Sequence, residues 1–308
     1  MACKGVSHME IITKRKMWFL VSLVIVIIGF GSLILNGLNL GIDFTGGTIL
    51  HVSLGEEYEV EEVRDVLEDF GLEDSVIQQA TDSQGETSEV IIRTTSLQEQ
   101  ERNEIIEGLR GNWPQIEDED VLRSANVGAT IGDELRSQAI WSLLIASIGM
   151  IAYISYRFEF SFAISAIVAI LHDAFIVLTI FSLFQIEINS PFIAAVLTII
   201  GYSINDTIVI FDRIRETLQL EKKLPLNDVI TTSISKTLTR SLNTSGTTTL
   251  VLLSLLIFGG VTLRPFILAL LIGVISGTYS SVFIASNVWS TLSEKMGSQY
   301  GNRKKSTS

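Results

Sequence analysis

A carboxylate stands inside one of the most apolar stretches of this chain. Asp206 lies in the run SPFIAAVLTIIGYSINDTIVIF (Ser190–Phe211), which otherwise has the composition of a membrane-spanning helix. A helix centred near Gly201 places Asp206 about 7 to 8 Å from the midplane of a hydrocarbon core roughly 30 Å thick. An ionised side chain at that depth costs at least about 2.5 kcal/mol, and such residues are rare and usually functional. Asp206 therefore predicts a protein that moves charge.

Other polar residues could act with Asp206. His172 and Asp173 lie near the middle of the preceding apolar run, and histidine titrates in a range useful for a proton relay. A neutral histidine, or a protonated aspartate that caps a neighbouring backbone, is the alternative. Adjacent side chains on a helix point about 100° apart, so the two cannot face one site equally. Ser203 and Asn205 could hydrogen-bond the Asp206 carboxyl group or line a hydrated path, or could simply hold helices together.

The composition describes a polytopic membrane protein of 308 residues, 47% hydrophobic, with a mean hydropathy of +0.42. The apolar runs are too long for the core helices of a soluble domain. Six predicted spans cover Met17–Leu35, Ala139–Tyr156, Ser161–Phe184, Ser190–Phe211, residues 241–260 and Pro265–Trp289. Residues 212–240 join spans four and five. Apolar residues recur there at helical spacing, which predicts an amphipathic helix along the inner membrane surface, either a coupling element or a passive connector.

Lysine and arginine fix the expected orientation, because basic loops stay on the cytoplasmic side. They gather in residues 1–16, 212–240 and 290–308, so both termini are expected in the cytoplasm. Residues 1–8 resemble vector sequence, and the lone Cys3 excludes an internal disulfide or a thiolate metal site.

Four charged residues lie at the inner mouth of span four: Asp212, Arg213, Arg215 and Glu216. Solvated topology signals account for these charges, and gating ion pairs are the alternative.

Residues 36–138 are then extracytoplasmic and predict a small α+β domain. They hold 24 acidic residues and 6 arginines, a net charge of −18, against +6 for the remainder. Strands are predicted at Thr48–Leu54, Ser75–Gln79, Ser88–Thr95 and Asp120–Ala125, with helices at Val60–Phe70 and Leu97–Arg110. This order gives a ferredoxin-like split βαβ unit. The acidic faces are solvated surface or a docking surface for a polypeptide, and neither charge half suggests nucleic acid.

Glycines mark expected turns and close contacts. Gly41, Gly46 and Gly47 in GIDFTGGT should form the turn from the first span into the external domain. This segment lacks the GKS or GKT ending of a phosphate-binding loop, so no nucleotide cofactor is expected. Gly273 and Gly277 form a small-xxx-small pattern suited to close helix packing, and Gly201 is a further structural glycine of the spans.

Seven motifs together carry a family resemblance. They are GIDFTGGT (Gly41–Thr48), VGATIGDELR (Val127–Arg136), YRFE (Tyr156–Glu159), HD (His172–Asp173), GYSINDTIVIFDRIRE (Gly201–Glu216), RSLNTSGTT (Arg240–Thr248) and GTYSSVFIAS (Gly277–Ser286). In this order they closely resemble the SecF side of the SecD/SecF family of protein-export membrane proteins, within the RND transporter superfamily. The resemblance runs from about Met17 to Trp289. The chain departs from it at Ala129, where the family often has proline.

The resemblance implies a half-transporter that pairs with a six-span SecD and assists export of unfolded polypeptides after the SecYEG channel and the SecA motor. It maps the family's intramembrane aspartate onto Asp206 and its functional arginine onto Arg240. The implied mechanism is uptake and release of H⁺ or Na⁺, with Arg240 stabilising the ionised carboxylate in one state. No other cofactor and no metal are expected. An RND-type carrier of lipids or small molecules is the alternative; an intramembrane enzyme is disfavoured, because the spans lack protease signals.

Overall fold

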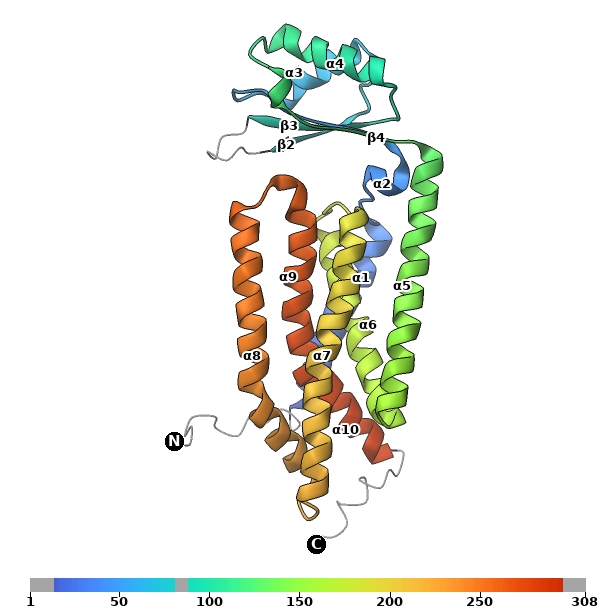
Figure 1. Ribbon diagram of the computed structural model, residues 1–308, viewed down its shortest axis with the longest axis vertical. Coiled ribbons are helices and arrows are strands. Elements are labelled where there is room, and N and C mark those ends of the chain that lie inside the picture. The colour runs from blue at the N-terminus through green and yellow to red at the C-terminus, as the bar shows by residue number, and fades with distance from the viewer. Residues whose placement is uncertain (1–13, 81–87, 296–308) are drawn as a thin grey trace. The chain divides into compact units, whose positions relative to one another are not determined.

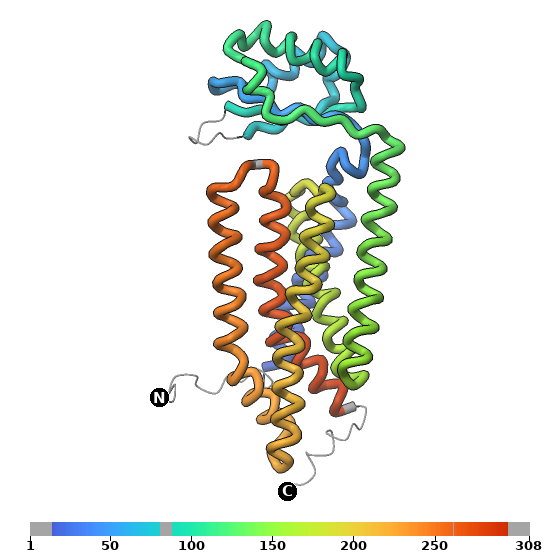
Figure 2. Tube along the Cα trace, in the orientation of Figure 1, coloured from blue at the N-terminus to red at the C-terminus, as the bar shows by residue number. Residues whose placement is uncertain are grey.

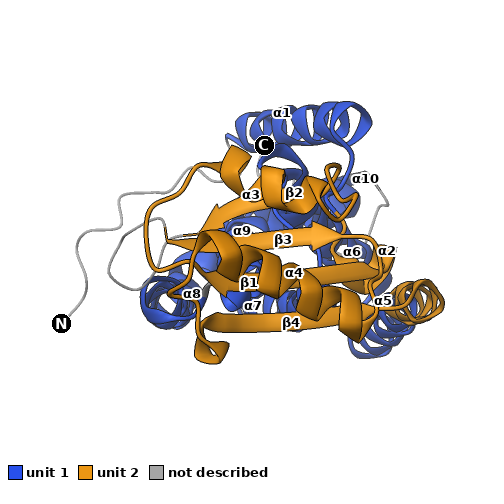
Figure 3. Cartoon of the chain, turned by 90° about the horizontal axis from the view of Figure 1, so that it is seen from above, with its two compact units in different colours: residues 1–39, 142–308 blue, residues 40–141 orange. Residues whose placement is uncertain are grey.

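A computed structural model of the chain describes residues 14–80 and 88–295, and Figure 1 shows the order of its elements. The segment that resembles vector sequence, Cys3, and much of the predicted C-terminal tail lie outside the described residues. The chain forms two compact units, one of residues 1–39 and 142–308 and the other of residues 40–141 (Figure 3).

Among the described residues, six helices are long and apolar enough to cross a membrane, which confirms the predicted number of spans. They are α1 (Arg15–Leu35), α5 (Ala129–Arg157), α6 (Phe160–Leu183), α7 (Ser190–Leu220), α8 (Leu226–Phe258) and a last helical stretch that begins with α9 (Arg264–Tyr279). Several continue beyond their apolar cores: α5 begins at Ala129 rather than Ala139, and α7 runs to Leu220. Hydropathy marks the apolar part of a helix, whereas backbone hydrogen bonds continue through polar residues.

The predicted surface helix between spans four and five is not a separate element. Residues 226–240 and the fifth span form the single helix α8, whose first part is turned relative to the rest in Figure 1. Its apolar face is buried within the protein, with Val229, Ile230 and Ile234 each 0% exposed. Ser233 on this face donates to Thr217 Oγ1 of α7 at 3.0 Å. The prediction that this face rests on the membrane surface is wrong, because α7 extends far enough to cover it.

The last spanning stretch is interrupted by a π-helix. After α9 the chain continues through η3 (Ser280–Ala285), a π-helical turn, into α10 (Ser286–Lys295), and Figure 2 shows the three as one path. A π-helical turn shifts the faces of the helix on either side of it and is frequent at functional sites. Here it begins at Ser280, a fully buried hydroxyl residue.

The second unit contains a four-stranded sheet. Its elements follow in the order β1 (Gly47–Ser53), α3 (Val60–Glu68), β2 (Val76–Ala80), β3 (Glu89–Thr94), α4 (Glu99–Asn112) and β4 (Val121–Val127). The strands lie in the order β2-β3-β1-β4, all antiparallel, as the top view of Figure 3 shows. These are the strands and helices that the sequence predicts for this segment.

One face of this sheet carries the core. Leu50 and Val52 of β1 and Ile92 of β3 are 0% exposed and form one apolar cluster with Val63 and Leu109 of the two helices. Alternation along each strand sends every second side chain to this face, and helical spacing supplies the facing residues. Both helices begin with a capping box, at Glu59 and at Gln98, which satisfies free N–H groups of the first turn.

Candidate functional site

Glycines bring α9 close to α7. A Cβ on Gly273 would lie 2.3 Å from Ile199 Cγ1, and one on Gly277 would lie 3.1 Å from Ser203 Cβ. The first distance is far shorter than van der Waals contact, so position 273 requires glycine. The sequence assigns a packing role to both glycines. Their close approach lets hydroxyl groups of α9 and α7 converge on α6.

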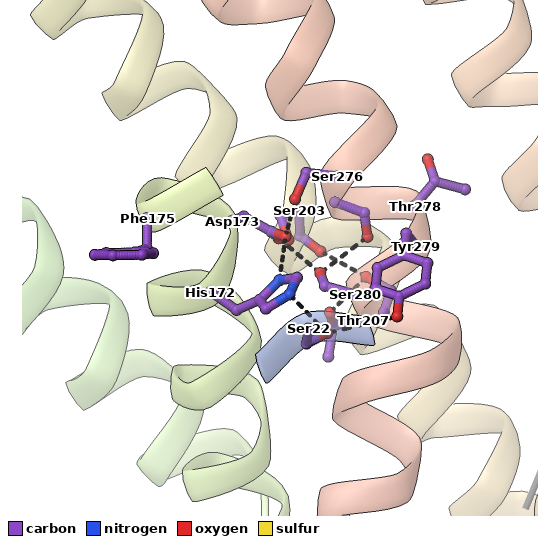
Figure 4. A network of polar contacts seen from close by, with 12 residues as sticks. Ser22, His172, Asp173, Phe175, Ser203, Thr207, Ser276, Thr278, Tyr279 and Ser280 are labelled. Atoms are coloured by element: carbon purple, nitrogen blue, oxygen red, sulfur yellow. Dashed lines mark hydrogen bonds and ion pairs between the residues drawn. The ribbon is translucent and has the colours of Figure 1, made fainter. Parts of the chain in front are cut away.

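Asp173 of α6 lies where these helices meet, as the close view in Figure 4 shows. The residue is 1% exposed. Oδ1 accepts a hydrogen bond from Ser276 Oγ at 2.6 Å and lies 3.3 Å from His172 Nδ1, which can donate to it, and Oδ2 accepts from Ser203 Oγ at 2.6 Å and Ser280 Oγ at 2.7 Å. An ionised carboxylate has about four lone-pair sites, so the four donors match an ionised Asp173.

His172 turns toward α1 while it contacts its neighbour Asp173. Its Nε2 lies 3.0 Å from Ser22 Oγ, and its ring stacks near Tyr279 with centroids 6.0 Å apart. Ser22 Oγ is also 3.5 Å from Tyr279 Oη, which donates to Trp18 O at 3.2 Å. A chain of polar contacts therefore joins α1, α6 and α9. His172 hydrogen-bonds α1, whereas Asp173 hydrogen-bonds α7 and α9, although the two adjacent side chains also contact each other.

Asp206 occupies a different environment, between α7 and α8. Ser241 Oγ of α8 donates to Asp206 Oδ1 at 2.5 Å. Asp206 Oδ2 is buried and has no hydrogen-bond partner among the described residues. Arg240, the expected partner, is close enough to attract Asp206 electrostatically. Within residues 14–80 and 88–295, however, no hydrogen bond or ion pair joins the two, and the Arg240 side chain is exposed.

The residues expected to support Asp206 are placed differently from the prediction. Ser203 donates to Asp173 instead, because its hydroxyl lies on the face of α7 that meets α6 and α9. Asn205 is exposed. The hydroxyl that does bond Asp206 belongs to Ser241, one residue beyond Arg240. The sequence alone does not give the packing direction of α7, so it could not decide which of the two aspartates Ser203 faces.

The charges at the inner mouth of span four form two contacts. Arg157 of α5 lies 3.9 Å from Asp212, with both side chains about half exposed, and Arg213 pairs with Glu216 at 2.6 Å within α7. Arg215 is exposed. Exposed pairs of this kind contribute about 0 to 1 kcal/mol. Within the part of the chain that the structure describes, Asp212 is the one of these candidates that forms an ion pair with another helix.

The remaining predicted glycines fall into two groups. Gly46 and Gly47 have φ of +72° and +129°, a region that side chains disfavour, and a Cβ on Gly47 would lie 2.6 Å from Thr94 O. Gly41 has an ordinary φ of −73° and precedes the one-turn helix α2 (Ile42–Thr45). Gly201 has open space where a Cβ would lie, so nothing in the described structure requires a glycine there.

Several residues of this network were not singled out by the sequence analysis. Ser22, Ser241, Ser276 and Ser280 all bond one of the two aspartates or His172. Ser276 and Ser280 are four residues apart in an apolar span, and this spacing could have marked them as one polar stripe. The π-helical turn that begins at Ser280 has no comparable signal in the sequence.

The two carboxylates therefore differ in what they can do. Asp173 already has donors on both oxygens, whereas one buried oxygen of Asp206 has no hydrogen-bond partner in the described part of the chain. Such an oxygen can take up a proton or a new donor without breaking an existing bond. Among the described residues no three His, Cys, Asp or Glu side chains come together as a metal-binding group. Asp206 is the better candidate for ion exchange.

The fold and these residues define a class of multi-pass membrane protein: six spanning helices, an α+β unit between the first two, and carboxylates inside the spans. The family model described as "Protein export membrane protein SecD/SecF, C-terminal" matches residues 113–295, and the model described as "SecD/SecF GG Motif" matches residues 31–54. The chain belongs to the SecD/SecF family of protein-export membrane proteins.

Named relatives agree with this assignment. The protein translocase subunit SecF of Sebaldella termitidis is 40% identical over 279 residues, covering 90% of each chain. The translocase subunit SecDF of Bacillus subtilis is 38% identical over 90% of this chain but only 37% of its own. A crystal structure of SecDF from Thermus thermophilus, described as a translocon-associated membrane protein, matches with a TM-score of 0.86 and 34% identity, over 96% of this chain and 40% of that one.

Proposed function

We propose that this protein is the SecF-like subunit of a SecDF complex that uses a transmembrane ion gradient, of H⁺ or Na⁺, to assist protein export through the Sec translocon. Its family and the names of its relatives support a role in the Sec pathway. The distribution of lysine and arginine supports a position of both termini in the cytoplasm. The bacterial translocase subunits among its relatives support a place in the bacterial inner membrane.

The observation that carries the proposed ion coupling is the uneven bonding of Asp206. One carboxylate oxygen is fixed by Ser241 and the other is buried without a partner. Arg240, on the same helix as Ser241, attracts the carboxylate without pairing with it. A movement of α8 relative to α7 would change both the hydroxyl donor and the distance to the guanidinium. In one position of the helices the charged carboxylate would be favoured, and in the other the neutral carboxyl group.

An exposed polar surface supports SecD as the partner. Asn205 on α7 and Arg240, Asn243, Thr244 and Thr247 on α8 are exposed, although both helices are membrane spans. Polar side chains that face lipid are costly, so such residues normally face another helix or a water-filled cavity. A second six-span half would cover this surface and complete the surroundings of Asp206. SecYEG, SecA and the exported polypeptide complete the proposed assembly.

For the external unit we propose the ferredoxin-like, split βαβ architecture. The support is its element order together with its sheet order: β1 and β2 run parallel with β3 between them, antiparallel to both, and β4 lies on the far side of β1. Comparing the Cα trace of residues 40–141 with solved ferredoxin-like domains would test this assignment.

Asp206→Asn tests the proposed coupling. The substitution keeps the size and the bond to Ser241 but removes the charge. Export of a secretory precursor would be measured in membrane vesicles that contain the variant with SecD, SecYEG and SecA, with and without an imposed gradient. The gradient-dependent part of export is expected to fall at least tenfold, with the gradient-independent part unchanged. Separate protonophore and sodium-ionophore treatments identify the coupling ion.

Asp212→Asn is the matched control, because Asp212 lies on the same helix in a half-exposed pair with Arg157. It should leave the gradient-dependent rate unchanged. Ion coupling through Asp206 would be refuted by a normal gradient-dependent rate in the Asp206→Asn complex. Failure of the chain to copurify with SecD would refute the proposed assembly.

A further inference from the structure

We infer that His172 and Asp173 form a second proton-binding centre, in which an imidazolium on α6 compensates the buried carboxylate and bonds α1. This inference rests on the proposed function for its role in ion coupling, and on the geometry alone for its charge state. It concerns a pair separate from Asp206, whose carboxylate accepts a hydrogen bond from Ser241 of α8.

The charge of Asp173 is the first step. Among the described residues, the hydroxyls of Ser203 and Ser276 each hydrogen-bond only the Asp173 carboxylate, at 2.6 Å in both cases. With Ser280 and His172, donors surround both oxygens. A protonated carboxyl group would itself donate one bond. Ser280 could accept it, because its hydroxyl also reaches Gly277 O at 3.3 Å, but the hydroxyls of Ser203 and Ser276 have the carboxylate as their one acceptor among the described residues. The arrangement therefore fits the ionised form.

A carboxylate with 1% exposure inside a spanning helix needs a positive charge nearby. Among the described residues that bond Asp173, only His172 can carry one, since the other donors are serines. An imidazolium donates from both ring nitrogens, and here both have an oxygen in reach, Asp173 Oδ1 at 3.3 Å and Ser22 Oγ at 3.0 Å.

The surroundings of His172 support the same direction of hydrogen bonds. Ser22 can accept from His172 Nε2 and donate onward to Tyr279 Oη, which donates to Trp18 O. Tyr279 is also the further titratable group that faces His172 from α9, with stacked rings (Figure 4). Among the described residues, the hydrogen bonds of the pair to α1 and α7 involve the hydroxyls of Ser22 and Ser203, which bring no charge.

Deprotonation of the His172 imidazolium would remove one of its two hydrogen-bond donors. A neutral ring keeps a donor on only one nitrogen, so either the bond to Asp173 or the donation to Ser22 ends. In either case the carboxylate loses its counter-charge. The first case also ends the donation to Asp173 Oδ1, and the second alters the contact between α1 and α6. Proton binding at this pair would thus be coupled to the packing of α1 against α6 and α9.

The test measures the protonation of His172 directly. The chain has three histidines, His8, His51 and His172. The protein labelled with ¹⁵N-histidine would be assembled with SecD in lipid vesicles and studied by solid-state NMR. Ring signals that persist in both the His8→Gln and the His51→Gln variants belong to His172. These two substitutions leave the proposed pair intact.

At neutral pH, where an ordinary imidazole is mostly uncharged, both ring nitrogens of His172 should show imidazolium shifts. In Asp173→Asn, one of them should change to the shift of an unprotonated nitrogen. Ser182→Ala, which removes the 2.8 Å bond between Ser32 of α1 and Ser182 of α6, is the matched control and should leave the His172 shifts unchanged.

An unprotonated ring nitrogen on His172 in the unsubstituted protein at that pH would overturn the inference. This result does not depend on whether the Asp173→Asn variant folds. Imidazolium shifts that persist in a folded Asp173→Asn protein would also overturn it, because the charge would not depend on the carboxylate. Neither reading depends on export, so failure here is distinguishable from failure of the coupling proposed for Asp206.

Discussion

At the residue scale, the cost of burying a carboxylate is met in two ways. Asp173 is surrounded by four donors from three helices, so its position is over-determined. Asp206 has one donor and one unpaired oxygen. An unsatisfied buried polar atom costs about 1 to 3 kcal/mol. Asp206 therefore retains free energy that a change in its surroundings can release, whereas Asp173 has little left to gain.

Tyr58 in the external unit gives a prediction that depends on pH. Its hydroxyl donates to Glu89 O at 2.8 Å, and burial, followed by the charge of Glu89, raises the pKa of Tyr58 to about 12. An unfolded tyrosine titrates near about 10. Between these values the unfolded chain binds fewer protons, so the stabilising contribution present below about pH 10 is lost as pH rises toward about 12.

Phenolate absorbance measured on the folded protein should therefore show one tyrosine that titrates near pH 12. This component should be missing in Tyr58→Phe. The variant should also lose less stability than the unsubstituted protein between about pH 10 and about pH 12, because it has no phenol to ionise. If the titration step that Tyr58→Phe removes instead lies at about pH 10, the fold does not hold the Tyr58 phenol in its neutral form.

At the element scale, the packing of α9 against α7 sets the polar network. Gly273→Ala would place a methyl group 2.3 Å from Ile199, so the helices must separate. Overpacking of this kind typically costs about 1 to 3 kcal/mol. Thermal unfolding of the purified protein in detergent should therefore begin several degrees lower. Gly201→Ala is the matched control, because its methyl group meets open space on α7. Equal melting temperatures for the two variants would contradict the close packing.

The sequence predicts which helices and strands exist more readily than it predicts which side of each helix packs against which neighbour. Long apolar runs predicted all six spans, and periodicity predicted the strands and helices of the external unit. The face that Ser203 presents, toward Asp173 rather than Asp206, depends on how α7 packs, which no local pattern encodes. The same reason explains α8: its amphipathic face fits a membrane surface as well as it fits the inner end of α7.

At the scale of the whole molecule, the membrane helices differ in how much of their surface is buried. In the most apolar part of α5 only 6% of the residues are buried, and in that of α8 only 11%, against 44% for α6 and for α7. For α5 the exposed residues include the apolar Ile145 and Ile148, which lipid can cover. For α8 they include Thr244 and Asn243, which lipid solvates poorly. The exposed polar side of α8 is the reason to expect a protein partner there.

Cysteine labelling tests where that partner sits. Cys3→Ser removes the single cysteine of the chain, and Thr244→Cys then places one thiol on the exposed polar side of α8. In lipid vesicles, a water-soluble maleimide should label this thiol in the isolated chain, because polar neighbours admit water. After assembly with SecD the labelling rate should fall at least tenfold, since the partner's helices would exclude the reagent.

Two control positions separate this protection from other effects. Lys222→Cys lies in the exposed loop between α7 and α8 and should label equally with and without SecD, which shows that the reagent remains active. Leu250→Cys lies on α8 in an apolar position that is 66% exposed, and lipid should protect it in both samples. If Thr244→Cys labels at the same rate in both, SecD does not cover this side of α8, and another surface must join the two halves. If it is unlabelled even in the isolated chain, lipid or a second copy already covers it, and the polar surface carries no argument for SecD.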